Sequence, residues 1–72
     1  MEVIDPHNAA EIFFDRLHEV KIIDEITRIV LVSRQDGVGV VVARLAVPLS
    51  ELPDAIQMLV IALTEAVRNA KI

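Results

Sequence analysis

The longest apolar pattern in the chain covers residues 26 to 47 and is interrupted once, by the polar tetrad Arg34-Gln35-Asp36-Gly37. Both flanks are rich in valine, isoleucine and leucine, which is typical of strands, and Asp-Gly is a favoured pair for a tight hairpin turn. The pattern therefore predicts an antiparallel hairpin with strands over about residues 26–34 and 38–47.

Both faces of this hairpin are expected to be apolar. A loop of two or four residues gives the same side-chain parity, and it places Arg28 and Arg44 on opposite faces, each within an aliphatic run. A sheet with two apolar faces needs two coverings, and a chain of 72 residues struggles to supply both. We therefore expect the chain to complete its core with another chain.

A long C-terminal helix is predicted over about residues 50–70. Pro48 ends the second strand, Ser50 offers an N-cap, and Pro53 is tolerated only in a first helical turn. The apolar arc of this helix spans roughly 200°, whereas one packing contact requires about 100°. We expect the helix to pack on the sheet and to contact a second partner as well.

The N-terminal part is more ambiguous. Asn8 and Glu11 are spaced as a capping box, and apolar residues recur at helical spacing, which favours a helix over about residues 8–19. The Ile-Phe-Phe run favours a strand over residues 11–14 instead, and residues 20–24 read as a third strand or as an extended entry into the hairpin. The expected fold is a single α+β domain over residues 1–72: an N-terminal helix (or strand), a hairpin with a possible third strand, and a C-terminal helix packed on the sheet.

The composition of the chain limits the partners and the cellular location that we expect for it. The net charge is -4, from 7 Lys and Arg against 11 Asp and Glu, which argues against binding nucleic acid or anionic lipid. The chain has no Cys and only two aromatic residues, Phe13 and Phe14. No apolar run approaches the roughly 18 residues of a membrane span, and the first residues lack the features of a signal peptide. A cytoplasmic protein without a membrane span is expected.

One stripe of polar residues invites a metal hypothesis. His7, Glu11, Asp15 and His18 are spaced by four, four and three residues, which would align them on one side of a helix over residues 8–19. The stripe lacks a matched ligand motif, so we interpret it as the solvated side of that helix and predict no metal site.

Arg28 and Arg44 suit either an anion site or pairing with Asp24, Glu25 or a carboxylate on a partner, and pairing is the favoured interpretation. Ser33 and Ser50 have no His and Asp companions that would suggest a hydrolytic triad. Asp36-Gly37 with Gly39 is a turn signal and lacks the third glycine of a phosphate loop. No catalytic residue, enzyme activity or cofactor is predicted.

The order of segments resembles that of short uncharacterised bacterial and phage-associated proteins, a resemblance that implies no activity. Its matching residues are Ala43-Arg44-Leu45-Ala46-Val47-Pro48 and Leu52-Pro53-Asp54-Ala55-Ile56. The chain also resembles gas vesicle shell proteins, which implies a helix, hairpin and helix around a very apolar sheet. The residues that carry this second resemblance are Ala10-Glu11, Asp15-Arg16-Leu17, Ile22-Ile23-Asp24, Arg28, Leu31-Val32 and Ala43-Arg44. The chain departs from that family at Val20-Lys21, where the family has Lys-Gly, in having no Trp after Asp24, and at Pro48 and Pro53.

These observations favour a small noncatalytic module that associates with itself as a homodimer or higher homo-oligomer, with a structural or scaffolding role. The alternatives are an acidic regulator or inhibitor that binds another protein, and a shell component similar to those of gas vesicles. The candidate interface residues are Met58, Ile61, Ile29, Leu31, Val40, Val42 and Arg44.

Overall fold

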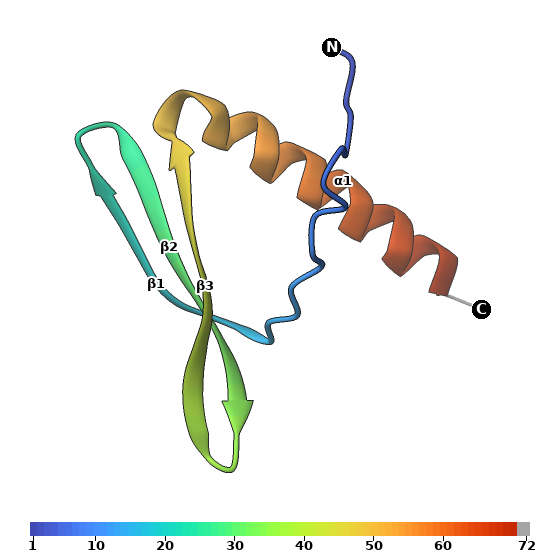
Figure 1. Cartoon of the computed structure of the whole chain (residues 1–72). Helices are drawn as coiled ribbons and strands as arrows, with labels where there is room; N and C mark the ends of the chain where they lie inside the picture. Colours follow the sequence, from blue (N-terminus) through green and yellow to red (C-terminus); the bar gives the residue numbers. More distant parts are fainter. Residues whose placement is uncertain (71–72) are drawn as a thin grey trace.

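A three-stranded antiparallel sheet followed by one long helix makes up the regular part of the chain (Figure 1). The computed structural model describes residues 1–70. Its elements are β1 (Arg16–Ile23), β2 (Ile26–Gln35), β3 (Val38–Pro48), the 3₁₀ turn η1 (Leu49–Glu51) and α1 (Leu52–Ala70). The strands lie in the order β1-β2-β3, so β2 is central and both β1 and β3 are edges. The α+β class predicted from the sequence is confirmed.

The turn of the β2–β3 hairpin has two residues, which is one of the two lengths that the sequence left open. Asp36 and Gly37 have φ values of 51° and 79°, and Gln35 pairs directly with Val38 across the turn. Positive φ at both central residues is the geometry that matches the twist of the flanking strands. Asp24 and Glu25 make a similar turn between β1 and β2, with φ values of 52° and 63°.

The C-terminal helix is also confirmed. Pro48 is the last residue of β3, and Pro53 is the second residue of α1, where no intrahelical donor is needed. The backbone N of Leu49 donates to the carbonyl O of Glu25 at 2.8 Å, which ties η1 to the turn between β1 and β2. The chain thus passes from the sheet into α1 without a loop.

The expected N-terminal helix over residues 8–19 is wrong. Residues 8–15 carry neither helix nor strand, and from Arg16 the chain forms β1, so the possible third strand exists and is longer than residues 20–24. The strand proposed for residues 11–14 is absent too. A short helix is marginal without packing, whereas Leu17, Val20 and Ile22 gain paired neighbours on β2 as strand residues.

Two β-bulges interrupt the sheet, and neither was expected. On β1, Leu17 pairs with Leu31 and Glu19 pairs with Val30, which leaves His18 as the extra residue. On β3, Val41 pairs with Val32 and Ala43 pairs with Leu31, so Val42 is extra there. Each extra residue reverses the in-and-out alternation of its strand beyond the bulge.

The bulges sort the side chains into two unlike faces, which corrects the expectation of two apolar faces. Because directly paired residues share a face, the register assigns Arg28 and Arg44 to the same face, not to opposite ones. The apolar face consists of Leu17, Val20, Ile22, Thr27, Ile29, Leu31, Ser33, Val38, Val40, Ala43, Leu45 and Val47, with Gln35 at its end. The basic face consists of Arg16, Glu19, Lys21, Ile23, Ile26, Arg28, Val30, Val32, Arg34, Gly39, Val41, Arg44, Ala46 and Pro48.

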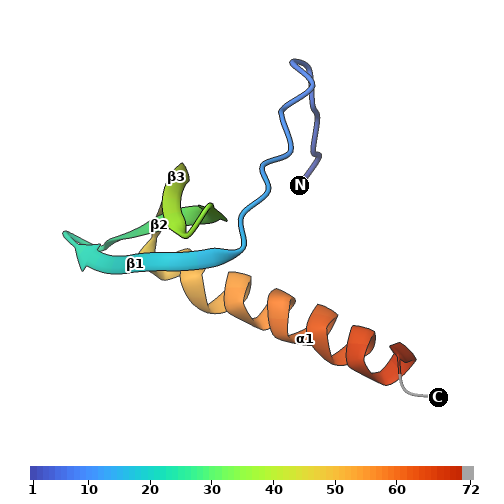
Figure 2. The same cartoon turned by 90° about the horizontal axis from the view of Figure 1, so that it is seen from below.

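The chain has almost no core of its own. Among the described residues only Thr27, Leu31 and Val32 are buried, and none of them lies on α1. The helix leaves the end of the sheet and projects away from it (Figures 1 and 2), so the predicted packing of the helix on the sheet is not formed within one chain. The radius of gyration is 15.1 Å, against about 11 Å for a compact domain of this length.

Candidate functional site

The apolar face of the sheet is uncovered over most of its area. Val20, Ile22 and Leu45 each keep about half of their surface exposed. The β2 residues that pair with them across the strands are better covered. Thr27 is completely buried, and its Oγ1 has no hydrogen-bond partner. Aliphatic side chains arranged in this way on three strands form a surface suited to another apolar surface.

The second uncovered apolar surface is the helix stripe, which we define as the residues of α1 that recur at helical spacing on one side. These residues are Leu52, Ala55, Ile56, Leu59, Leu63, Ala66, Val67 and Ala70. Leu59 is 71% exposed and Leu63 is 63% exposed, and only Leu52 at the start is half-buried. A helix with this pattern gains most of its stability from burying the stripe against another element.

The structure distributes the seven interface candidates over four places. Met58 and Ile61 lie on α1 with large exposed fractions, 72% and 56%. Ile29, Leu31 and Val40 lie on the apolar face, while Val42 is the bulged residue and Arg44 lies on the basic face. Leu31 is buried already and does not offer a surface.

The basic face gathers charge of one sign. It carries five of the seven Lys and Arg residues of the whole chain, whereas its carboxylates are those of Glu19 and, at its rim, Asp15. The five cationic residues are Arg16, Lys21, Arg28, Arg34 and Arg44, and all of them are exposed. An acidic protein therefore has one strongly basic surface.

The arrangement of charges on this face includes an unfavourable contact. Lys21 on β1 lies directly opposite Arg28 on β2, and like charges in that position destabilise a sheet. Lys21 Nζ also pairs with Glu19 Oε2 at 3.5 Å. Within residues 1–70 the four arginines of the basic face make no ion pair, so Arg28 and Arg44 do not pair with Asp24 or Glu25 in the single chain, and pairing with a carboxylate of a partner stays a prediction.

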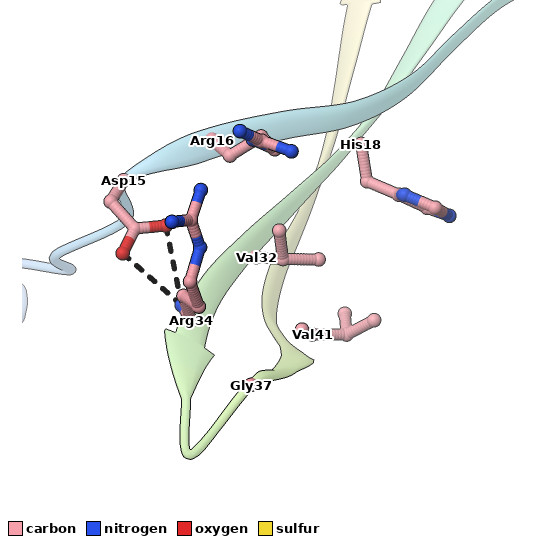
Figure 3. A pocket seen from close by; sticks show the side chains of 8 residues that line it. Asp15, Arg16, His18, Val32, Arg34, Gly37 and Val41 are labelled. Carbon is pink, nitrogen blue, oxygen red and sulfur yellow. Dashed lines mark hydrogen bonds between the residues drawn. The ribbon is translucent and has the colours of Figure 1, made fainter.

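Two shallow hollows lie along the basic face. The first, of about 350 Å³, lies between β1 and the β2–β3 turn and is lined by residues that include Arg16, His18 and Arg34 (Figure 3). The Asp15 carboxylate at its rim accepts a hydrogen bond from the backbone N of Arg34 at 3.1 Å. The second hollow, of about 360 Å³, lies nearer the turn between β1 and β2, and Lys21, Arg28 and Arg44 line it. The cations of the face thus border both hollows.

The stripe of His7, Glu11, Asp15 and His18 does not exist as a unit, because the segment that should align it is not helical. Over the described part of the chain, no group of three or more His, Cys, Asp or Glu residues is placed to hold a metal ion. None of the helices described over residues 1–70 is long and apolar enough to cross a membrane.

Comparisons with known proteins found no match: no family model, no curated protein and no solved structure is significantly similar to this chain. The two resemblances noted from the sequence therefore gain no support from relatives. The helix, hairpin and helix layout implied by gas vesicle shell proteins also lacks its first helix over the described residues.

The sequence did not point to Arg16, Lys21 and Arg34 as members of a common surface. Simple alternation placed Arg28 and Arg44 on opposite faces of the hairpin, near its outer ends and within apolar runs. A shift of one residue within β3 collects both arginines on one face, and the observed bulge at Val42 supplies that shift.

Proposed function

We propose that this chain is a noncatalytic self-associating module in which a second copy completes the hydrophobic core. The observation that carries the proposal is that two apolar surfaces of one chain, the apolar face and the helix stripe, are largely exposed and do not pack on each other along their lengths. Each surface has the size and chemistry to cover the other.

The exposed area supports the need for a partner. The chain exposes 6688 Å², whereas a folded monomer of 8.0 kDa is expected to expose about 4,500 Å². The excess of about 2,200 Å² per chain, doubled for two partners, falls in the range of permanent homodimer interfaces. Residues 1–15 contribute part of this excess, and the sheet and α1 contribute the rest.

A symmetric dimer is the simplest closed arrangement, with α1 of each copy lying across the apolar face of the other. The direct passage from β3 through η1 into α1, fixed by the hydrogen bond from Leu49 to Glu25, holds the helix away from its own sheet. A partner's helix faces no such restraint. This arrangement buries both apolar surfaces and leaves the basic face outside.

A charge on the helix stripe tests this arrangement. Leu59→Glu places a carboxylate in the middle of the proposed interface, where it loses its hydration without gaining a partner. We expect the free energy of unfolding to fall by roughly 3 kcal/mol or more, with loss of self-association. Size-exclusion chromatography with light scattering gives the molar mass, and urea unfolding followed by circular dichroism gives the stability.

Gln57→Glu is the matched control, because it adds the same charge to the polar side of the same helix. The control should keep the molar mass and stability of the original protein. If Leu59→Glu behaved like Gln57→Glu, the helix stripe would not be an interface.

A further inference from the structure

We propose that the basic face binds the phosphate backbone of a nucleic acid strand without reading its base sequence. The register places five cationic side chains of an acidic protein on one face of a three-stranded sheet, against the carboxylate of Glu19 on the face and that of Asp15 at the rim of its first hollow. This binding function is separate from self-association, because the two use opposite faces of the sheet.

The composition of the face fits phosphate groups. Four of its five cations are arginines, whose planar guanidinium groups bind phosphate oxygens with two hydrogen bonds at once. The cations extend along β2 from Arg28 to Arg34, a distance of about 20 Å at 3.3 Å per residue. A row of this length suits a polymer with repeated negative charges better than a single small anion.

The surface between the cations lets a chain approach closely. Gly39 and Ala46 present little or no side chain, and Val30 is half-buried in the sheet. The two hollows lie towards opposite ends of the face, and each is bordered by at least two cations. The face has no aromatic residue on which bases could stack, so backbone contact is the mode of binding it supports.

The repulsion between like charges on the basic face is a second observation that supports phosphate binding. Lys21 and Arg28 lie opposite each other on neighbouring strands, and the arginines of the face make no ion pair within residues 1–70. An arrangement that costs stability in the free protein is compensated when an anion neutralises it. The net charge of -4 led us to expect no nucleic acid partner, but net charge does not describe a surface on which the cations are concentrated.

Fluorescence anisotropy with a labelled single-stranded DNA of about 20 nucleotides, with RNA and duplex DNA of the same sequence beside it, tests the proposal. We expect binding at about 50 mM salt that weakens steeply by about 200 mM, with a slope set by the number of phosphates neutralised. The triple variant Lys21→Gln, Arg28→Gln, Arg44→Gln should bind about tenfold more weakly or worse, and the slope for single strands should fall by about two.

Arg68→Gln is the control, because Arg68 lies on α1 and pairs with Glu65 at 3.9 Å, away from the basic face. It should bind DNA like the original protein, and molar mass and circular dichroism should be unchanged in both variants. The proposal is overturned if no DNA or RNA binds at low salt, if the triple variant binds as well as the original, or if Arg68→Gln weakens binding equally. Tighter binding of polyglutamate than of DNA would also overturn it, in favour of an acidic protein partner.

Discussion

At the scale of single residues, the backbone conformation at the turns explains why particular amino acids occupy them. Gly37 has a φ of 79°, in a region that side chains with a Cβ rarely adopt, and its neighbour Asp36 also has a positive φ. Asp tolerates this region better than most residues, and Gly adopts it without steric cost. The Asp-Gly pair was therefore a reliable signal from which the turn could be predicted.

A pair of glycine substitutions separates backbone strain from packing. A Cβ added at Gly37 would meet no atom within 4 Å, so Gly37→Ala should destabilise only through its φ, by about 1 kcal/mol. At Gly39 the φ is not positive and the nearest atom to a new Cβ is Val32 Cγ2 at 3.8 Å, so Gly39→Ala should be tolerated. Urea unfolding of both variants measures the difference. Equal stability of the two would show that the turn does not hold this φ.

Thr27 is buried like Leu31 and Val32, but its side chain is polar. Its hydroxyl oxygen is buried without a hydrogen-bond partner, which usually costs about 1 kcal/mol or more. Replacement by valine, which has nearly the same shape, should therefore stabilise the protein by about 1 kcal/mol. Thermal unfolding checks this expectation. A loss of stability in Thr27→Val would mean that the hydroxyl gains a partner in the assembled protein.

At the scale of elements, local sequence signals predicted the hairpin and the C-terminal helix. They failed where the secondary structure of a segment depends on its contacts with other elements. The two prolines at positions 48 and 53 determined where β3 ends and α1 begins. Residues 8–19 had equally regular helical spacing, yet residues 16–19 pair with β2 as part of β1, and residues 8–15 form no regular element. Periodicity shows which side of a helix would be apolar, but it does not show whether that side is covered.

The bulges explain why the candidate site was harder to predict than the strands. A bulge adds one residue to a strand, and no feature of the composition near His18 or Val42 marks its place. Each bulge nevertheless changes the face of every residue beyond it. The basic face therefore depends on register, which is a property of strand pairs and not of one strand.

The opposed cations on β1 and β2 yield a prediction about the sheet itself. Arg28→Glu replaces a repulsive cross-strand neighbour of Lys21 by an attractive one, so the free energy of unfolding should rise by about 0.5 kcal/mol. The same variant should bind single-stranded DNA more weakly, because a cation of the basic face becomes a carboxylate. Chemical unfolding and anisotropy measure the two effects.

A rise in stability together with weaker DNA binding would indicate that the face retains its cations for binding and not for folding. Arg28→Gln is the control, since it removes the repulsion without adding an attraction, and its stability should lie between those of the other two proteins. If Arg28→Glu destabilised the sheet, Lys21 and Arg28 would not be the neighbours that the register indicates.

At the scale of the whole molecule, each face of the sheet has its own proposed role. In the proposed assembly, copies associate through the apolar face and the helix stripe, and the basic face stays accessible on the other side of the same strands. With three buried residues among those described, a single chain has little to offset the conformational entropy that folding costs. Folding and association are therefore expected to occur together.

The molar mass of the original protein, measured by light scattering over about a hundredfold range of concentration, tests the central claim most directly. We predict a particle of about 16 kDa, twice the chain mass of 8.0 kDa, and a midpoint of thermal unfolding that rises with protein concentration. A particle of 8.0 kDa that stays folded at micromolar concentration, with an unfolding midpoint independent of concentration, would contradict the claim that a second copy completes the core.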